Sequence, residues 1–169
     1  MRAYYLLATA ALLAAVGGLG WKIDSDLREQ ARRDAAQQLQ GLTFSPYAAQ
    51  KVVYHVAMSG GLFDRAYLDV LGSLANHVRA VGAGNLDARV VLQADGLGLL
   101  QHATSNAHLR SAIDSLRASG VKFEVCRNSM LSRGVTPDSL YGLQREDIVA
   151  AGVAEVSALE GRGYVYVRF

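Results

Sequence analysis

The chemistry suggested by this sequence centres on one cysteine. Cys126 follows the predicted strand 121–125 and precedes Arg127, in a chain of 169 residues with no second cysteine. A thiol between a strand and a helix lies near free backbone N–H groups and the positive end of the helix dipole, which lower its pKa. We expect the Arg127 guanidinium to help stabilise the thiolate. The spacing leaves open the alternative of a buried cysteine that packs as a small hydrophobic residue.

Small and polar residues follow the ends of the predicted strands. The strands are predicted over residues 51–56, 88–93 and 121–125. In an open parallel sheet the carboxyl ends of the strands meet at one edge, and ligands bind there. We therefore expect a binding edge near Cys126 made of the residues that follow these strands: Ser59, Gly60, Asp95, Gly96 and Asn128.

The elements that must position these residues alternate along the chain. Apolar residues at helical spacing predict helices over residues 62–81, 106–118 and 153–159, and two short strands are predicted near the end of the chain. Strands that alternate with helices imply β-α-β units, whose right-handed crossovers place helices on both faces of a sheet. We predict an α/β fold with a mainly parallel sheet of about five strands and helices on both faces.

Several kinds of site are not indicated. The four histidines show no recognised metal-ligand spacing, so we expect no metal and no cofactor. His102 or His108 is instead a candidate base for Cys126. A net charge of +2, without a stripe of basic residues, argues against a nucleic-acid partner.

The chain begins with a hydrophobic stretch. Residues 3–20 contain no charged side chain, and Trp21 and Lys22 follow them. At about 1.5 Å per residue, a helix of this length just crosses a hydrocarbon core of roughly 30 Å. An aromatic residue and a cation at its edge favour an uncleaved membrane anchor, and a cleaved signal peptide is the alternative. Either places the rest of the protein outside the cytoplasm, on the periplasmic face of the bacterial inner membrane or free in the periplasm.

We therefore predict three segments. Residues 1–22 form a hydrophobic helix that acts as the membrane anchor or signal peptide. Residues 23–46 form a polar helical linker, because good helix formers dominate there and apolar residues are sparse. Residues 47–169 form the α/β domain.

The domain resembles the DsrE-like family, which includes DsrE, DsrF and TusD proteins. A strand, a cysteine, a short helix and an Arg-Gly-Val exit resemble the cysteine segment of that family. The resemblance implies the YchN-like fold and a homo-oligomer or hetero-oligomer. The sequences that carry it are KVVYHV, VVLQADGLGLL, VKFEVCRNSMLSRGV and the closing stretch DIVAAGVAEVSALEGRGYVYVRF.

In that family the matching cysteine accepts sulfane sulfur as a persulfide and passes it on. The resemblance therefore implies that Cys126 is a sulfur acceptor, and that the protein is at most a sulfurtransferase-like carrier in sulfur oxidation or trafficking. Its partners would then be protein sulfur donors and acceptors. The alternative is a non-catalytic binding or assembly module that belongs to a membrane-associated complex.

Overall fold

The computed structural model describes residues 21–169. The chain divides into two compact units, and the boundary between them falls after Ser45. In the first unit, residues 21–38 form a helix whose side chains are exposed. Two ion pairs each join residues one helical turn apart on this helix: Arg28 with Asp24 at 3.0 Å and Arg33 with Glu29 at 3.2 Å. The helix is therefore polar, with hydrophobic residues only at intervals.

The predicted membrane anchor lies outside the described residues. It was assigned to residues 3–20, and the structure describes the chain from residue 21. Within the described part of the chain, every helix is too short or too polar to cross a membrane. The anchor and its hydrophobic helix thus stay predictions from the sequence.

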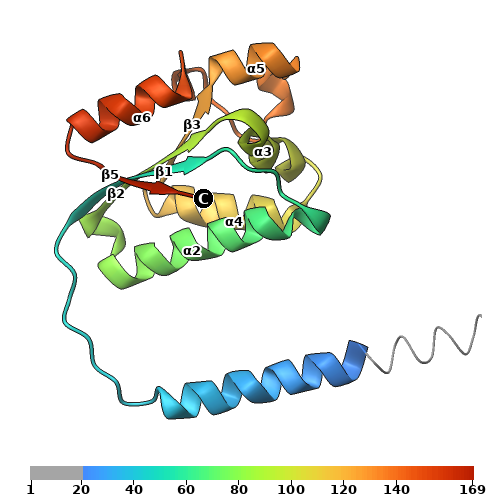
Figure 1. Cartoon of the computed structure of the whole chain (residues 1–169), viewed down its shortest axis with the longest axis vertical. Coiled ribbons are helices and arrows are strands. Elements are labelled where there is room, and N and C mark those ends of the chain that lie inside the picture. Colours follow the sequence, from blue (N-terminus) through green and yellow to red (C-terminus); the bar gives the residue numbers. More distant parts are fainter. Residues whose placement is uncertain (1–20) are drawn as a thin grey trace, which may run out of the picture. The chain divides into compact units, whose positions relative to one another are not determined.

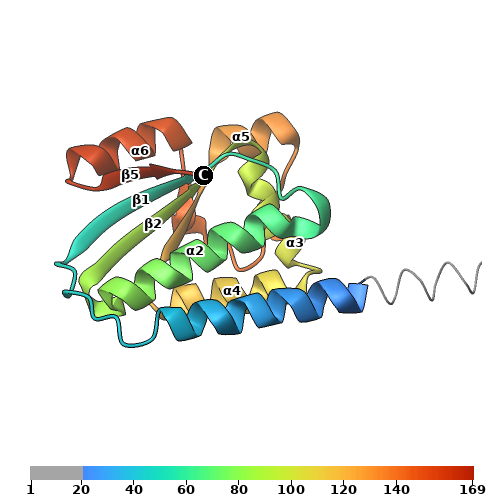
Figure 2. The ribbon, with the colours of Figure 1, turned by 60° about the horizontal axis from the view of Figure 1, so that its bottom comes forward.

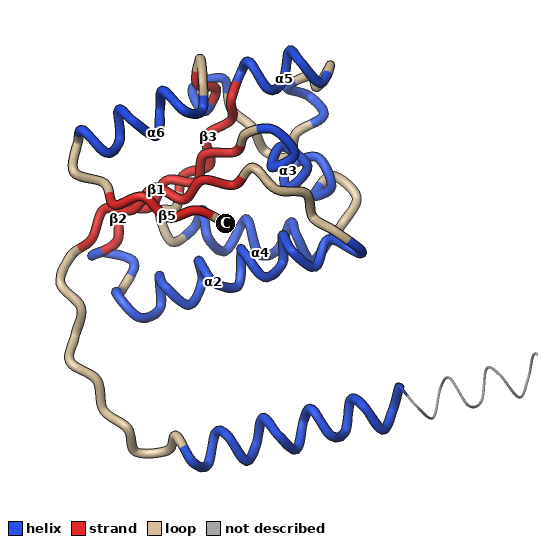
Figure 3. The backbone as a smooth tube through the Cα atoms, in the orientation of Figure 1, coloured by secondary structure: helices blue, strands red, loops and turns tan. Residues whose placement is uncertain are grey.

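The second unit, Pro46–Phe169, is organised around a five-stranded sheet with strand order β4-β3-β2-β1-β5 (Figures 1 and 3). All four pairs of neighbouring strands are parallel, which confirms the predicted α/β fold. The central strands are apolar nearly throughout because helices cover both faces of the sheet. The strands are β1 (Gln50–Val56), β2 (Leu86–Leu92), β3 (Lys122–Cys126), β4 (Ile148–Val149) and β5 (Val165–Arg168).

The helices lie on opposite faces of the sheet, as Figure 2 shows with α2 and α4 on one side and α6 on the other. Short helices α3 and α5 follow the carboxyl ends of β2 and β3 and lie at that edge of the sheet (Figure 1). The helices of this unit are α2 (Arg65–Val81), α3 (Gly98–Ala103), α4 (Ala107–Ala118), α5 (Arg127–Arg133) and α6 (Gly152–Gly161).

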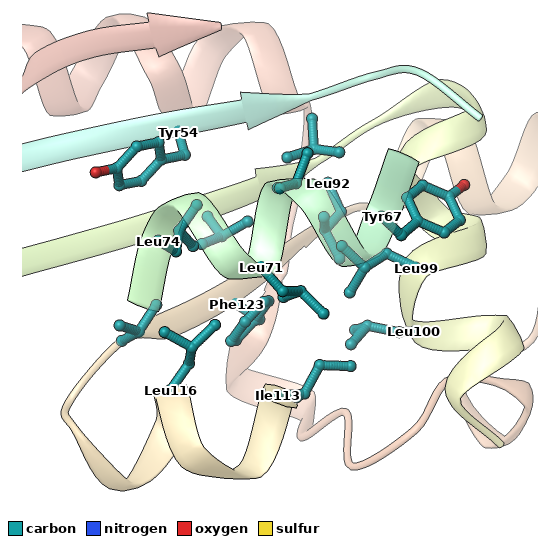
Figure 4. Packing of buried hydrophobic residues seen from close by; sticks show 14 of the residues in the cluster. Tyr54, Tyr67, Leu71, Leu74, Leu92, Leu99, Leu100, Ile113, Leu116 and Phe123 are labelled. Atoms are coloured by element: carbon teal, nitrogen blue, oxygen red, sulfur yellow. The ribbon is translucent and has the colours of Figure 1, made fainter. Parts of the chain in front are cut away.

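Two hydrophobic clusters hold the layers together. The larger cluster lies between the sheet and α2, α3 and α4, where Tyr67, Leu99 and Phe123 are each at most 2% exposed (Figure 4). A smaller cluster packs α6 on the opposite face and consists of Val53, Val91, Val156, Leu159 and Tyr164. Because both clusters include residues of β1 and β2, the central strands are fixed and the loops at their carboxyl ends start from rigid points.

Two parts of the chain differ from the sequence-based prediction. The helix predicted over residues 62–81 begins only at Arg65, because Phe63 and Asp64 adopt left-handed backbone conformations with φ of 55° and 59°. Helix α3 was not predicted, because residues 97–100 read Leu-Gly-Leu-Leu and show no helical spacing. Both differences lie at the carboxyl edge of the sheet, where the candidate site residues gather.

Candidate functional site

Cys126 is the last residue of β3 and the residue that caps the start of α5. Its Sγ accepts a hydrogen bond from the backbone N–H of Ser129 at 3.4 Å. The residue is 3% exposed. The predicted position at a strand-helix junction is therefore correct, and the thiol is buried there.

The environment of the thiol favours its ionised form. Burial raises the pKa of Cys126, but hydrogen bonds to the sulfur prevail, so the pKa lies below its ordinary value. Arg127 is exposed. The groups that lower the pKa are therefore hydrogen-bond donors rather than a neighbouring guanidinium: the side chain of Ser129 and the backbone N–H groups of Gly152, Ser129 and Asn128.

Two helix starts converge on this sulfur. Ser129 and Asn128 belong to the first turn of α5, and Gly152 is the first residue of α6. The approach of Gly152 is close, because a Cβ built there would lie 3.4 Å from the Cβ of Cys126 and 2.6 Å from Oε1 of Gln93. Free N–H groups at helix starts stabilise negative charge, so this arrangement suits a thiolate.

Ser129 links the thiol to the neighbouring loop. Its Oγ accepts a hydrogen bond from the backbone N–H of Ala94 at 3.0 Å. Ala94 has a left-handed backbone with φ of 52° and begins the 3-10 turn Ala94–Leu97 after β2. The cysteine segment and the Asp95 loop are thus joined at the carboxyl edge, as the sequence suggested.

Replacement Ser129→Ala is expected to raise the pKa of Cys126, because a hydrogen bond to the thiolate is lost. Alkylation of the thiol would then require a higher pH. At a pH below the pKa of the wild-type thiol, the variant would react several-fold more slowly than the wild type. The measurement is the rate of iodoacetamide labelling against pH. Ser132→Ala is the matched control, because that hydroxyl bonds the Ser129 carbonyl instead. An unchanged labelling midpoint in the Ser129 variant would contradict this assignment.

A separate cavity of about 360 Å³ opens at the same edge. Three predicted residues of the binding edge line it: Ser59, Gly60 and Asp95. The structure adds residues from α2, α3 and the end of α5: Tyr67, Gly98, Gln101, His102 and Arg133. Cys126 and Asn128 are not among the lining residues. The thiol and the cavity are therefore two separate sites at the same edge of the sheet.

Gly96, also predicted for the binding edge, is buried and does not line the cavity. A Cβ built there would lie 2.0 Å from the carbonyl oxygen of Val56. Only a residue without a side chain lets the turn after β2 pack on the end of β1. Gly96 therefore supports the edge from within.

Two polar pairs at the cavity were not predicted from the sequence. His102 Nδ1 lies 2.6 Å from Oδ1 of Asp64, and Arg133 donates to Oδ1 of Asp95 at 2.9 Å. The sequence offered His102 as a base for Cys126, whereas the structure places it on the cavity beside Asp64. In each pair the partners are 38 positions apart in the sequence, so no local pattern signals them.

The second unit is an open parallel α/β domain with a buried cysteine at the carboxyl edge of its sheet. The chain belongs to the DsrE/DsrF-like family, whose model matches residues 46–169. This match covers the whole second unit of the structure.

Solved structures share the fold of the second unit. The protein of unknown function MTH1491 from Methanobacterium thermoautotrophicum is similar with a TM-score of 0.54 and 24% sequence identity, over 71% of this chain and 99% of that chain. Comparison with curated proteins gave no match. The solved neighbour supports the fold of the second unit.

Proposed function

We propose that this protein is a sulfur carrier, in which Cys126 accepts a sulfane sulfur as a persulfide and passes it to a partner protein. The observation that carries the proposal is the convergence of two helix starts on Sγ, which lowers the pKa of the thiol. The thiolate is the nucleophilic form that sulfur transfer needs. Membership of the DsrE/DsrF-like family supports the same role.

The transfer balances without an added oxidant or reductant. The Cys126 thiolate attacks the terminal sulfur of a donor persulfide, R–S–SH. The S–S bond of the donor breaks, the electron pair leaves with the donor thiolate, and a new S–S bond forms on Cys126. Delivery repeats the step, with an acceptor thiolate attacking the outer sulfur of Cys126 and Cys126 leaving as a thiolate.

The burial of Cys126 fits a carrier that protects its cargo. A side chain that is 3% exposed reacts slowly with small reductants in solution. Partner binding that opens the contact between the cysteine and the start of α6 would accelerate the transfer. Proteins that dock on the domain are therefore favoured as acceptors, because a free small thiol does not provide docking energy.

We further propose that the domain works outside the cytoplasm. The support is the uncharged stretch 3–20, followed by the exposed polar helix over residues 21–38 as a spacer. An anchor would hold the domain at the periplasmic face of the inner membrane, and cleavage would release it into the periplasm. The proposed partners are protein sulfur donors and acceptors, within a homo-oligomer or a hetero-oligomer.

A second candidate is a binding or assembly module without thiol chemistry. Leu62 and Phe63 favour it, because these hydrophobic side chains are 76% and 81% exposed on the left-handed turn before α2. Exposed large hydrophobic side chains at a fixed turn are typical of contact surfaces. Under this hypothesis Leu62→Ser with Phe63→Ser would abolish partner capture, and Cys126→Ser would leave the function intact.

Incubation with a persulfide donor tests the carrier proposal. The intact mass of the wild-type protein is expected to rise by one sulfur atom, and Cys126→Ser should show no gain. Reduction with dithiothreitol should return the original mass, because the added sulfur is held by an S–S bond. A folded wild-type protein with a free thiol and an unchanged mass would rule out sulfur loading.

A further inference from the structure

The cavity at the carboxyl edge has the size and the lining of a ligand site. Its volume of about 360 Å³ is near the lower end of the range for small-molecule pockets. Glycines form part of its wall, and a Cβ built at Gly60 or at Gly98 would lie 2.5 Å from an atom of Tyr67. The space therefore depends on residues without side chains around a fixed aromatic ring.

Arg133 supplies hydrogen-bond donors to this cavity. A guanidinium carries five N–H donors, and the contact with Asp95 engages a single nitrogen, Nη2, at 2.9 Å. The ion pair is solvent-exposed, so it is weak and can exchange its carboxylate for another anion. The fork geometry of the guanidinium matches oxyanions in particular.

His102 is held at the cavity from behind. Nδ1 of its ring lies 2.6 Å from Oδ1 of Asp64, and the other oxygen of that carboxylate accepts from Asn106 Nδ2 at 3.0 Å. The hydrogen bond from His102 lowers the pKa of Asp64, which keeps the carboxylate ionised. The ring of Tyr67 meets the imidazole edge to face, with centroids 5.9 Å apart. These contacts fix the ring and leave Nε2 as the atom available to a ligand.

We propose that this cavity binds a small oxyanion between Arg133 and His102. The carboxylate of Asp64 orients the imidazole, as carboxylates behind a site commonly do, and the carboxylate of Asp95 gives up its contact with Arg133 to the anion. Nε2 of His102 donates to the anion when the ring is protonated, and accepts the proton of a monohydrogen oxyanion when it is neutral. The ligand is either a free inorganic ion or the anionic end group of a larger molecule. The proposal does not rest on the chemistry of Cys126, which does not line the cavity.

Isothermal titration of the full-length chain with inorganic phosphate, thiosulfate and glycerol phosphate tests the proposal, at an ionic strength held constant with chloride. We expect saturable binding of at least one of these ions. Arg133→Gln is expected to weaken it about tenfold or more, because a charge-assisted hydrogen bond is lost. Arg133→Lys should give an intermediate affinity, since it keeps the charge and loses the fork. Tighter binding of an inorganic ion would point to a free ligand, and tighter binding of glycerol phosphate to an end group.

Matched controls separate this site from general charge effects. Arg127→Gln removes a cation of α5, the helix of Arg133, that does not line the cavity. His108→Gln is the control for His102→Gln, because it removes a histidine of the next helix, α4, that does not line the cavity either. Both controls and Cys126→Ser should bind as the wild type does, whether or not the protein carries sulfur. The proposal is overturned if none of the three ions binds saturably, or if the folded Arg133→Gln and His102→Gln variants bind as tightly as the controls.

Discussion

Replacing Gly96 with alanine is expected to lower the free energy of unfolding by about 3 kcal/mol or more, the upper part of the range for overpacking. The added Cβ would lie 2.0 Å from the carbonyl oxygen of Val56 and 2.7 Å from its carbonyl carbon. These are backbone atoms, which cannot rotate away. The same oxygen accepts the backbone N–H of Gln93 at 3.0 Å, so relief of the clash would break a hydrogen bond between the ends of β1 and β2.

Urea denaturation followed by circular dichroism measures this change, with Gly72→Ala as the matched control. A Cβ at Gly72 meets no atom within 4 Å, and the residue lies inside α2. Alanine is favoured over glycine in a helix by about 1 kcal/mol, so the control should be stabilised. A Gly96→Ala protein within about 0.5 kcal/mol of the wild type would show that β1 and the turn after β2 do not pack so closely.

Replacing Gly60 with alanine is expected to destabilise the domain by about 2 kcal/mol and to distort the cavity. The added Cβ would lie 2.5 Å from Cδ2 of Tyr67 and 2.9 Å from a carboxylate oxygen of Asp64. Tyr67 is 1% exposed, and its hydroxyl donates to the carbonyl of Asp95 at 2.5 Å. The ring is therefore fixed at both ends, and the strain must spread to the loop that holds Asp64.

Two measurements on Gly60→Ala distinguish these consequences. Urea denaturation reports the stability, and titration with the oxyanion bound by the wild type reports the cavity. Gly61→Ala is an informative comparison, because a Cβ there meets no atom within 4 Å although φ is 65°. Its cost is backbone strain alone, of order 1–3 kcal/mol, because φ of 65° with ψ of −161° is a conformation that essentially only glycine adopts. Wild-type stability together with wild-type oxyanion affinity in Gly60→Ala would contradict the described packing around Tyr67.

The sheet could be predicted from the sequence because its central strands are buried on both faces. Apolar runs such as residues 52–56 and 88–92 are separated by helical spacing, and that alternation defines a parallel α/β sheet. The position of Cys126 was predictable for the same reason, since an apolar strand ends there and a helix follows. Local patterns were sufficient because each of these features depends on a short stretch of chain.

The surroundings of the thiol and the cavity depend on contacts across the fold. Gly152 comes to Cys126 from a helix that begins 26 positions later, and the sequence offered Arg127 because it is adjacent in the chain. Asp64 meets His102 through a left-handed backbone that non-glycine residues rarely adopt. The hydrogen bonds that the Asp64 carboxylate accepts from His102 and Asn106 compensate for that strain, and they form only when α2, α3 and α4 are packed together.

The mass of the native protein, isolated from the cells that make it without reducing agents, tests the central claim most directly. If Cys126 carries sulfur, a fraction of the molecules should be heavier by one sulfur atom, and dithiothreitol should remove that increment. Fragment masses should assign it to the peptide that contains Cys126, and the same spectrum reports whether residues 1–22 are retained. Native protein in which Cys126 is always an unmodified thiol, also during active sulfur metabolism, would contradict the carrier function.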